Sequence, residues 1–386
     1  MSKWLGEFTM GTMHPEFENP LRLDDTPLFE VVFQRIQKSP EHSIPFSEYM
    51  DVALYEGNHG YYAHPERRIV GRKGDFFTSV SVGGMFGFLL AQKIAAVRDS
   101  QFNSAEPFTV VEQGAHDGQL ALDILEGLRK LGITDIEYRI VDPRPETRRW
   151  LENRFNEAGF RDSVKIVESL DEAKAGQGIF LSNELLDAFP FRRLKFDKGE
   201  WLELQVGRVG DLPVWVSRPL APELQRYADE LGRDFDDGYT TEVCPAVDSW
   251  MREAATLFDK GFWWLIDYGY ESGDYFAPHR KDGTFRCYRN HQATEDPFRF
   301  PGETDITAHV NFTHVRSAAE EAGLKWYQFS DQHHFLIEAA RDWLLSIEGQ
   351  TSNLETEKRL RQFQTLTHPG MMGTQFKMAE LSRGMA

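Results

Sequence analysis

The pattern of apolar and polar positions is clearest between residues 109 and 128. The run TVV at 109–111 is β-branched and is typical of a buried strand. Apolar residues at 120, 124 and 128 then recur at the spacing of one helix face. Gly114 and Gly118 lie between the two patterns. The segment therefore predicts a strand, a tight turn and a helix, which is the first unit of an open α/β sheet.

Similar patterns along the rest of the chain predict further elements. Strand patterns occupy 137–141, 164–167, 177–181, 191–196, 201–206, 261–267 and 324–329. Helical periodicity occupies 28–36, 46–55, 82–97, 147–155, 313–322, 335–347 and 354–366. Ser47 is the expected N-cap of the second helix. The alternation of strands and helices predicts a Rossmann-like α/β fold.

These patterns divide the chain into segments. Residues 1–25 show no periodicity and are expected to form a flexible arm, and 26–100 an N-terminal helical region that covers the ligand site. The α/β core is expected in two parts, 101–206 and 257–386, separated by an inserted subdomain at 207–256, where the pattern weakens. Within the second part, the polar, aromatic-rich stretch 271–311 predicts a long loop, and loops of that length are usually functional or disordered.

Composition restricts the class of protein. The chain of 386 residues is long enough for two lobes, and 41% hydrophobic with 13% aromatic content indicates a globular protein. A net charge of −18 disfavours nucleic acid as a partner, because nucleic-acid-binding surfaces are usually basic. Cys244 and Cys287 make neither a disulfide framework nor a zinc motif. Without a run of 18 apolar residues or a recognisable secretory signal, we expect a cytoplasmic protein that is not inserted in a membrane.

The charged groups in the glycine turn restrict the kind of ligand that it can bind. A dinucleotide-binding turn reads G-x-G-x-x-G and holds a pyrophosphate at the helix N-terminus. Here His116 occupies the second glycine position, and the carboxylates of Glu112 and Asp117 would repel a pyrophosphate. S-adenosylmethionine (SAM) fits better, because it has no phosphate and carries a sulfonium and an ammonium group. The alternative is a strand-to-helix turn that binds no ligand.

Asp142 is the candidate for a ribose contact. It follows the strand predicted at 137–141, at about the distance from Gly118 at which nucleotide-binding α/β folds place an acidic residue. A carboxylate at this position can accept hydrogen bonds from both ribose hydroxyls. The alternative is an aspartate that only caps the following helix.

Glu184 and Asp187 are two carboxylates that follow the strand predicted at 177–181. Active-site groups of open α/β sheets lie at this carboxyl edge. The pattern predicts the start of a helix here, which would place both side chains on one helix face. The alternative is a solvated acidic first turn, stabilised by the helix dipole.

The histidines at 291, 309, 314, 333 and 334 raise the question of a metal site. Their spacings match no recognised ligand set. His333 and His334 are adjacent, and in a strand they would point to opposite sides. We therefore expect no metal site.

Several segments, in this order, resemble one known family. They are PFSEYMDVALY with GYY, GDFFTSVSVGGMFG, VVEQGAHDGQLALDIL, LSNELLDAFPFRRL, LIDYGY, and GETDITAHVNF followed by MMGTQFK. The set resembles the MidA-like SAM-dependent methyltransferases, whose mitochondrial members are arginine methyltransferases that help to assemble respiratory complex I. It spans residues from about 45 to 377. His116 replaces the middle glycine of the family's turn, and Val80-Ser81 replaces its usual Pro-Glu.

The resemblance implies a Rossmann-like SAM-dependent methyltransferase core with an N-terminal helical region and an inserted second lobe. It implies that the 75–79 loop closes over the cofactor. The implied cofactor contacts are Thr78, Glu112, Gly114, Ala115, Gly118, Asp142 and Asn183. Asn183 and Glu184 would face the site.

The expected function is transfer of a methyl group from SAM to an arginine of a protein partner. A guanidinium stays protonated and presents a planar fork of donors, which paired carboxylates can clamp. Glu184 and Asp187 are therefore the expected catalytic residues. A respiratory complex subunit is the first candidate partner, and the oligomeric state is left open. Two alternatives are a non-catalytic assembly factor that retains the fold and a nicotinamide-dependent oxidoreductase.

Overall fold

The computed structural model describes residues 27–57, 59–63, 78–103, 105–289, 292–351 and 353–385. The arm expected at 1–25 and most of the 75–79 loop lie outside these ranges. The described backbone forms an eight-stranded sheet, a five-stranded sheet and a small three-stranded sheet. None of the described helices combines the length with the apolar character that a membrane span requires.

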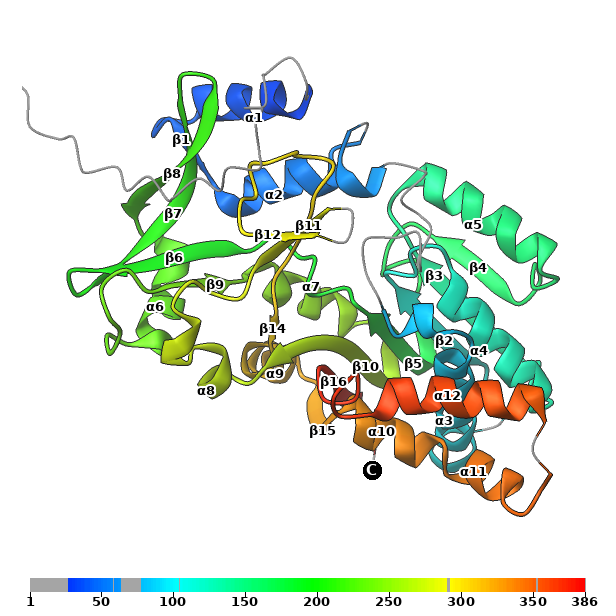
Figure 1. Cartoon of the computed structure of the whole chain (residues 1–386). Helices are drawn as coiled ribbons and strands as arrows, with labels where there is room; N and C mark the ends of the chain where they lie inside the picture. The colour runs from blue at the N-terminus through cyan, green and yellow to red at the C-terminus, as the bar shows by residue number, and fades with distance from the viewer. Residues whose placement is uncertain are drawn as a thin grey trace, which may run out of the picture.

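The eight-stranded sheet is the centre of the molecule (Figure 1). Its spatial order is β15 (Lys325–Asp331), β16 (Phe376–Arg383), β10 (Phe258–Tyr270), β5 (Ala175–Asn183), β2 (Phe108–Gln113), β3 (Ile136–Val141) and β4 (Val164–Val167), with β14 (Val310–Asn311) beside β10. The strands from β4 to β10 are parallel, and β16 runs antiparallel to its neighbours β10 and β15. Strands β2, β5 and β10 are almost wholly buried, as expected for central parallel strands that read as apolar runs.

Helices cover both faces of this sheet, and successive strand residues point into two different cores. Val110 and Trp264 belong to one core, while Val111 and Trp263 belong to the other. The first core is shared with α3 (Met85–Gln101), α4 (Gln119–Lys130), α5 (Pro145–Glu157), α10 (Gln332–Ala339), α11 (Arg341–Ile347) and α12 (Leu354–Thr367). The second is shared with α7 (Ala246–Ala254) and α9 (Phe312–Glu321).

Small residues let α3 and α4 approach closely. A Cβ atom added at Gly127 of α4 would lie 2.6 Å from the Cβ atom of Ala91 in α3. A Cβ atom at Gly87 would lie 2.4 Å from that of Asp123. The two helices can therefore pack closely at these positions.

The five-stranded sheet forms a second lobe, on the left of Figure 1. It contains β1 (Ser43–Pro45), β7 (Glu200–Val209), β6 (Arg192–Asp197) and β9 (Thr240–Val243), with β8 (Leu212–Pro219) beside β7. The helices α1 (Pro27–Lys38) and α2 (Phe46–Tyr55) pack on it, and α6 (Gln225–Leu231) lies at its other side. Residue 207, the expected start of the insertion, falls inside β7.

Some predicted elements differ from the structure. The stretch 271–311 is not one long loop, since it contains α8 (Ser272–Tyr275), η6 (Pro278–Arg280), β11 (Arg286–Arg289), β12 (Gln292–Thr294), β13 (Asp305–Thr307) and β14. The helix predicted at 335–347 is divided at Ala340 into α10 and α11. His333 and His334 lie in α10 and not in a strand, because the Asp331 carboxylate caps that helix by accepting the His334 N–H. Pro45, and not Ser47, is the N-cap of α2.

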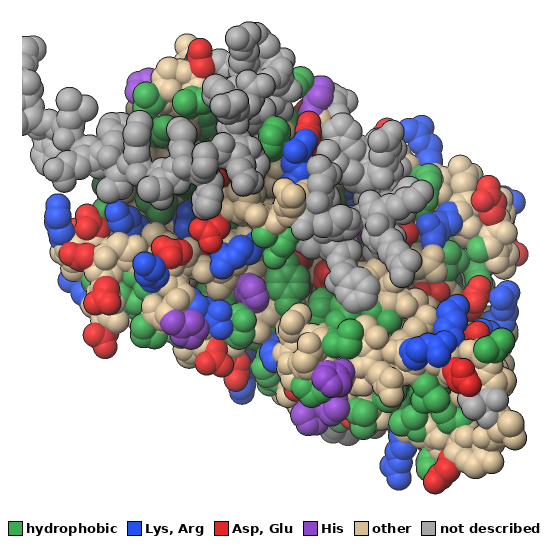
Figure 2. Space-filling view, in the orientation of Figure 1, with side chains coloured by type: hydrophobic (Ala, Val, Ile, Leu, Met, Phe, Trp, Pro, Cys, Tyr) green, Lys and Arg blue, Asp and Glu red, His purple; other side chains and the backbone are tan. Residues whose placement is uncertain are grey.

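The face of the molecule shown in Figure 2 carries acidic and basic side chains that are interspersed over both lobes. Apolar side chains are visible between them, mainly singly or in small groups. No large single-sign field is visible on this face outside the grey atoms.

Candidate active site

A cavity of about 560 Å³ lies at the carboxyl ends of β2, β3, β5 and β10. Tyrosines 55, 61 and 62 of α2 and η2 (Tyr61–Ala63) and residues 305 and 307 of β13 also contribute to its walls. The sequence-predicted residues that line it are Thr78, Glu112, Gly114, Ala115, Asp142, Asn183, Glu184 and Asp187. Gly118 does not line the cavity.

The turn between β2 and α4 has the left-handed backbone that its glycines suggest. Gly114 has φ 83°, His116 has φ 49° and Gly118 has φ 72°. His116 therefore adopts the conformation that a glycine takes more easily at the family's usual position. Gly114, Ala115 and His116 all line the cavity, so the backbone of this turn is open to a ligand.

Gly118 is needed for packing. A Cβ atom at Gly118 would lie 2.9 Å from Leu151 Cδ2 and 3.1 Å from the ring of Phe155, both in α5. This close approach explains a glycine at the N-cap of α4. The absence of a side chain at Gly118 thus lets the turn pack closely against α5.

Glu112 lies buried at the end of β2. Its carboxylate accepts a hydrogen bond from the Tyr138 hydroxyl at 2.6 Å. Burial raises the pKa of Glu112 to about 7, although the Tyr138 bond lowers it. Glu112 therefore provides an acceptor that lines the cavity and is held in place by Tyr138.

Asp142 is held by Arg144. The Arg144 Nη2 atom lies 2.7 Å from Asp142 Oδ2, and the Arg144 backbone N–H and Nε both donate to Asp142 Oδ1. Arg144 Nη1 also donates to the backbone oxygen of Tyr62. A carboxylate has about four acceptor positions, so the pairing leaves room for a ribose hydroxyl. Asp142 is at the predicted place, and its partner Arg144 is a residue that the sequence analysis missed.

Thr78 contacts the following turn. Its hydroxyl accepts the Ser81 N–H at 3.2 Å, and its own N–H donates to Ser81 Oγ at 3.0 Å. These bonds hold the start of the short helix η4 (Val80–Val82), where Val80 also lines the cavity. The rest of the 75–79 loop, apart from Ser79, lies outside the described residues.

The segment from Glu184 to Asp187, directly after β5, bends into a turn and is not the start of a helix. Glu184 has φ 52°, which breaks a helical path at once. The Asp267 carboxylate on neighbouring β10 then accepts the N–H groups of Leu186 and Asp187 at 3.0 and 3.3 Å. The prediction that a helix places both carboxylates on one face is therefore wrong, although the turn still brings both into the same cavity.

Carboxylates crowd this end of the cavity. Burial and then the nearby Asp187 raise the pKa of Glu184 to about 8. Burial raises the pKa of Asp187 to about 6, and that of Asp267 well above its usual value. Asp305 also lines the cavity and adds to the shift at Glu184. Each negative carboxylate disfavours ionisation of its neighbours, and a bound cation would favour the ionised forms.

Tyrosine side chains surround these acids. Tyr268 donates its hydroxyl to Asp187 Oδ2, and Tyr62 donates to Asp305 Oδ1 at 3.0 Å. The rings of Tyr55 and Tyr62 are stacked, with centroids 5.5 Å apart. Aromatic faces attract cations, so the arrangement combines two kinds of cation recognition.

The charged side chains that line the cavity fit SAM better than a phosphate-bearing cofactor. Among the described lining residues, Arg144 is the single lysine or arginine, and it is paired with Asp142. Besides Asp142, the acidic lining residues are Asp51, Glu112, Asp117, Glu184, Asp187 and Asp305. A sulfonium and an ammonium group suit these carboxylates, whereas a pyrophosphate would meet repulsion. In the described part of the chain, no cluster of three His, Cys, Asp or Glu side chains has the geometry of a metal site.

Known proteins resemble this chain over most of its length. A family model described as "Putative S-adenosyl-L-methionine-dependent methyltransferase" matches residues 89–330. The human "Protein arginine methyltransferase NDUFAF7, mitochondrial" is 25% identical over 409 residues, covering 98% of this chain and 87% of the human protein. Its Drosophila melanogaster homolog is 26% identical over 374 residues, covering 89% and 82%.

A solved structure shows the same fold. A Burkholderia thailandensis protein described as a "likely methyl transferase", with S-adenosyl-homocysteine bound, has a TM-score of 0.83 and 30% identity. The match covers 95% of this chain and 96% of that one. A second structure from Burkholderia thailandensis, solved as the native protein, has a TM-score of 0.81 and 29% identity.

These likenesses confirm the resemblance carried by the ordered segments and the Rossmann-like fold, and they set aside the nicotinamide-dependent alternative. They contradict the expected cytoplasmic location, because the curated relatives are described as mitochondrial. The chain belongs to the family of SAM-dependent methyltransferases, and S-adenosylmethionine is its cofactor.

Proposed function

We propose that the acceptor is an arginine side chain of a protein partner, held by Glu184 and Asp187. The observation that carries this proposal is the cluster of carboxylates at the end of β5, surrounded by tyrosines. A guanidinium keeps its charge in proteins and offers donors in a planar fork. It can therefore bond several carboxylates at once and lie against an aromatic ring.

The cavity divides naturally into two ends. The turn at 114–116, with Glu112 and Asp142, forms the end proposed for SAM, and Thr78 and Asn183 are proposed as further contacts. Glu184, Asp187 and Asp305 form the end proposed for the acceptor. Tyr62, from the N-terminal helical region, contacts both ends, because its backbone oxygen accepts from Arg144 and its hydroxyl donates to Asp305. Gly118 takes a supporting role, because its Cα faces α5.

The acid cluster suits the chemistry of guanidinium methylation. The bound cofactor supplies a methyl group on a positively charged sulfur. A guanidinium nitrogen forms the new N–C bond while the C–S bond breaks and its electrons stay on sulfur, and one N–H proton must leave. A bound guanidinium favours the ionised form of Glu184, so the carboxylate can orient the nitrogen and accept that proton. In the absence of the cation the raised pKa of Glu184, about 8, shows how readily it holds a proton.

The curated relatives are named as mitochondrial arginine methyltransferases. This supports a protein substrate, and we propose a subunit of a respiratory complex as the first candidate. The test incubates the purified protein with SAM and recombinant subunits, and locates each added methyl group by peptide mass spectrometry. Methylarginine in at least one subunit is the expected result. Methyllysine without methylarginine would count against the proposed acceptor.

A further inference from the structure

A second cavity, of about 380 Å³, adjoins the first. Asp187 and Phe189 line both cavities, so the two meet at the turn that follows β5. The second cavity extends away from the glycine turn, between α6, β9, α8 and the start of α9. A chain segment that places one side chain at Asp187 therefore has a neighbouring space for another.

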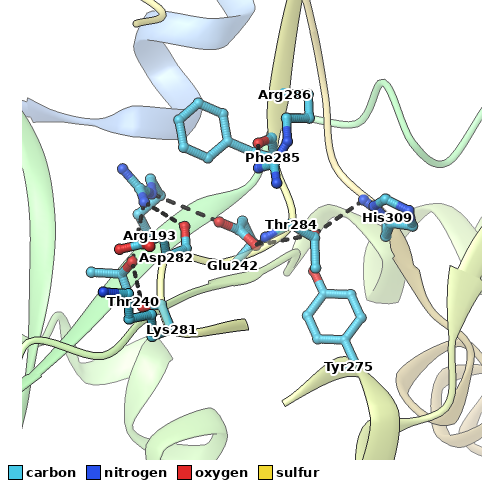
Figure 3. A network of polar contacts seen from close by, with 10 residues as sticks. All are labelled: Arg193, Thr240, Glu242, Tyr275, Lys281, Asp282, Thr284, Phe285, Arg286 and His309. Carbon is cyan, nitrogen blue, oxygen red and sulfur yellow. Dashed lines mark hydrogen bonds and ion pairs between the residues drawn. The ribbon is translucent and has the colours of Figure 1, made fainter. Parts of the chain in front are cut away.

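One wall of this second cavity is held by a hydrogen-bonded network (Figure 3). Thr284 is its centre, because its N–H and hydroxyl both donate to Glu242 Oε2, at 2.8 and 3.1 Å. The hydroxyl also accepts a hydrogen bond from the backbone N–H of His309 at 3.2 Å, and it lies 3.4 Å from the Tyr275 hydroxyl. Glu242, His309 and Tyr275 are all lining residues, so the wall is shaped before any ligand arrives.

Glu242 faces Arg193 on its other side. Arg193 Nε lies 3.7 Å from Glu242 Oε1, and Glu242 is buried. This pair brings no positive charge to the cavity surface, because Arg193 is not a lining residue. Burial lowers the pKa of His309 to about 4, so its ring is neutral near pH 7.

The remaining lining combines aromatic, apolar and acidic side chains with neutral polar ones and with His314, whose ring lies 3.0 Å from Asp248 Oδ1. Tyr227, Phe235 and Phe276 supply ring surface, and Glu230 is exposed at the margin. Among the described residues that line the cavity, there is no lysine or arginine. Apolar walls suit the methylene chain of a long side chain, and the exposed carboxylate of Glu230 suits its charge. An acidic side chain or a phosphate would meet Asp187 and Glu230 and be repelled.

We propose that the second cavity binds a basic side chain that lies near the target arginine in the same substrate segment. This inference rests on the proposed function, because it takes the first cavity to be the arginine site. The substrate would then be chosen by two cations at a fixed spacing, one methylated at Glu184 and one held beside Glu230.

The experiment uses synthetic peptides with one arginine in a neutral, glycine-rich sequence, and scans one lysine through the positions on either side. Methyl transfer is measured as kcat/KM with the whole protein and SAM, and binding is measured by fluorescence anisotropy. At one or two spacings, lysine should raise kcat/KM and affinity about tenfold over the lysine-free peptide, the scale of one well-placed charge pair. Norleucine at that spacing should give a smaller gain, and glutamate a loss.

The variant Glu230→Lys should abolish the lysine preference at that spacing. Ser317→Trp, at an exposed lining position, tests the same point by filling the space. The matched control is Asp229→Lys, an exposed acid of the same helix that does not line the cavity, and it should keep the preference. Binding of S-adenosyl-homocysteine and the melting temperature confirm that each variant is folded.

The inference would be overturned if kcat/KM and binding were the same for all peptides. It would also be overturned if none of the peptides bound. A lysine preference that survives both Glu230→Lys and Ser317→Trp would also overturn it. The proposed function fails differently. It fails when neither the lysine-free peptide nor a whole protein substrate acquires methylarginine, whatever the lysine preference in binding.

Discussion

Asp267 accepts the backbone N–H of Asp187 at 3.3 Å, across the gap between β10 and the turn that follows β5. The same carboxylate oxygen accepts the Leu186 N–H, and the other oxygen accepts the Tyr268 N–H. A carboxylate inside the sheet thus helps to hold the turn that follows β5. The position of Glu184 and Asp187 in the cavity depends on this long-range cap.

Asp267→Ala should therefore displace the turn and lower kcat at least tenfold, which requires only about 1.4 kcal/mol. Affinity for S-adenosyl-homocysteine should change less, because the glycine turn is on a different strand. Asp267→Asn keeps one acceptor oxygen and should restore part of the loss, which marks Asp267 as a positioning residue. Asp259→Ala, at an exposed site on the same strand, is the control. A lower melting temperature with unchanged kcat would reduce Asp267 to a stabilising role.

The pairing of Asp142 with Arg144 leads to a second prediction. Asp142→Ala should weaken SAM binding by about 1.5–3 kcal/mol, the scale of a hydrogen bond to a charged group. The ligand-free protein should also melt at a lower temperature, because Arg144 loses its ion-pair partner. The Asp142 side chain that is removed is only 9% exposed. Calorimetric titration and thermal unfolding measure the two effects.

A double variant separates these contributions. Asp142→Ala with Arg144→Ala should recover part of the melting temperature, because no unpaired guanidinium remains, but it should not recover SAM affinity. Recovery of affinity in the double variant would mean that Arg144, and not a lost ribose contact, weakens binding.

The raised pKa of Glu184 predicts how stability changes with pH. Its pKa is about 8 in the folded protein against an ordinary value of 4.5, so the folded state binds an extra proton between these pH values. The free energy of unfolding should therefore fall as pH rises from about 5 to about 8, by up to about 1.4 kcal/mol per pH unit from this group. Glu184→Gln should remove that part of the slope.

Urea unfolding of the ligand-free protein at several pH values measures this slope. Glu271→Gln is the control, since Glu271 is exposed just beyond the end of β10 and should leave the slope unchanged. An identical slope in Glu184→Gln and the wild type would mean that Glu184 is ionised throughout this range.

Much of the site was predictable because its residues follow strands with strong local patterns. The TVV run, Gly114 and the helical spacing after it determine the first turn, and Asp142 and Glu184 each follow an apolar strand. The carboxyl ends of parallel strands meet at one edge, so these positions converge without knowledge of distant contacts.

Other features depend on contacts far apart in the sequence, which a local pattern does not reveal. The turn at 184–187 resembles a helix start, and its path depends on long-range contacts such as those with Asp267, about 80 residues later. Tyr62 and Asp305 come from separate segments that pair across the cavity. Strands of two to four residues between 286 and 311 are too short for alternation to be recognised. The GYY, LIDYGY and GETDIT segments were the available signal for these missed residues.

In the proposed function, the carboxylates after β5 hold an arginine for methylation. The most direct test incubates wild-type protein and Glu184→Gln with SAM and an arginine-containing respiratory subunit, and quantifies methylarginine by mass spectrometry. Wild-type protein should produce methylarginine, and Glu184→Gln should produce it at least about tenfold more slowly while SAM affinity falls less. Equal rates in the two proteins, or methylation of lysine with none of arginine, would mean that Glu184 does not hold an arginine acceptor.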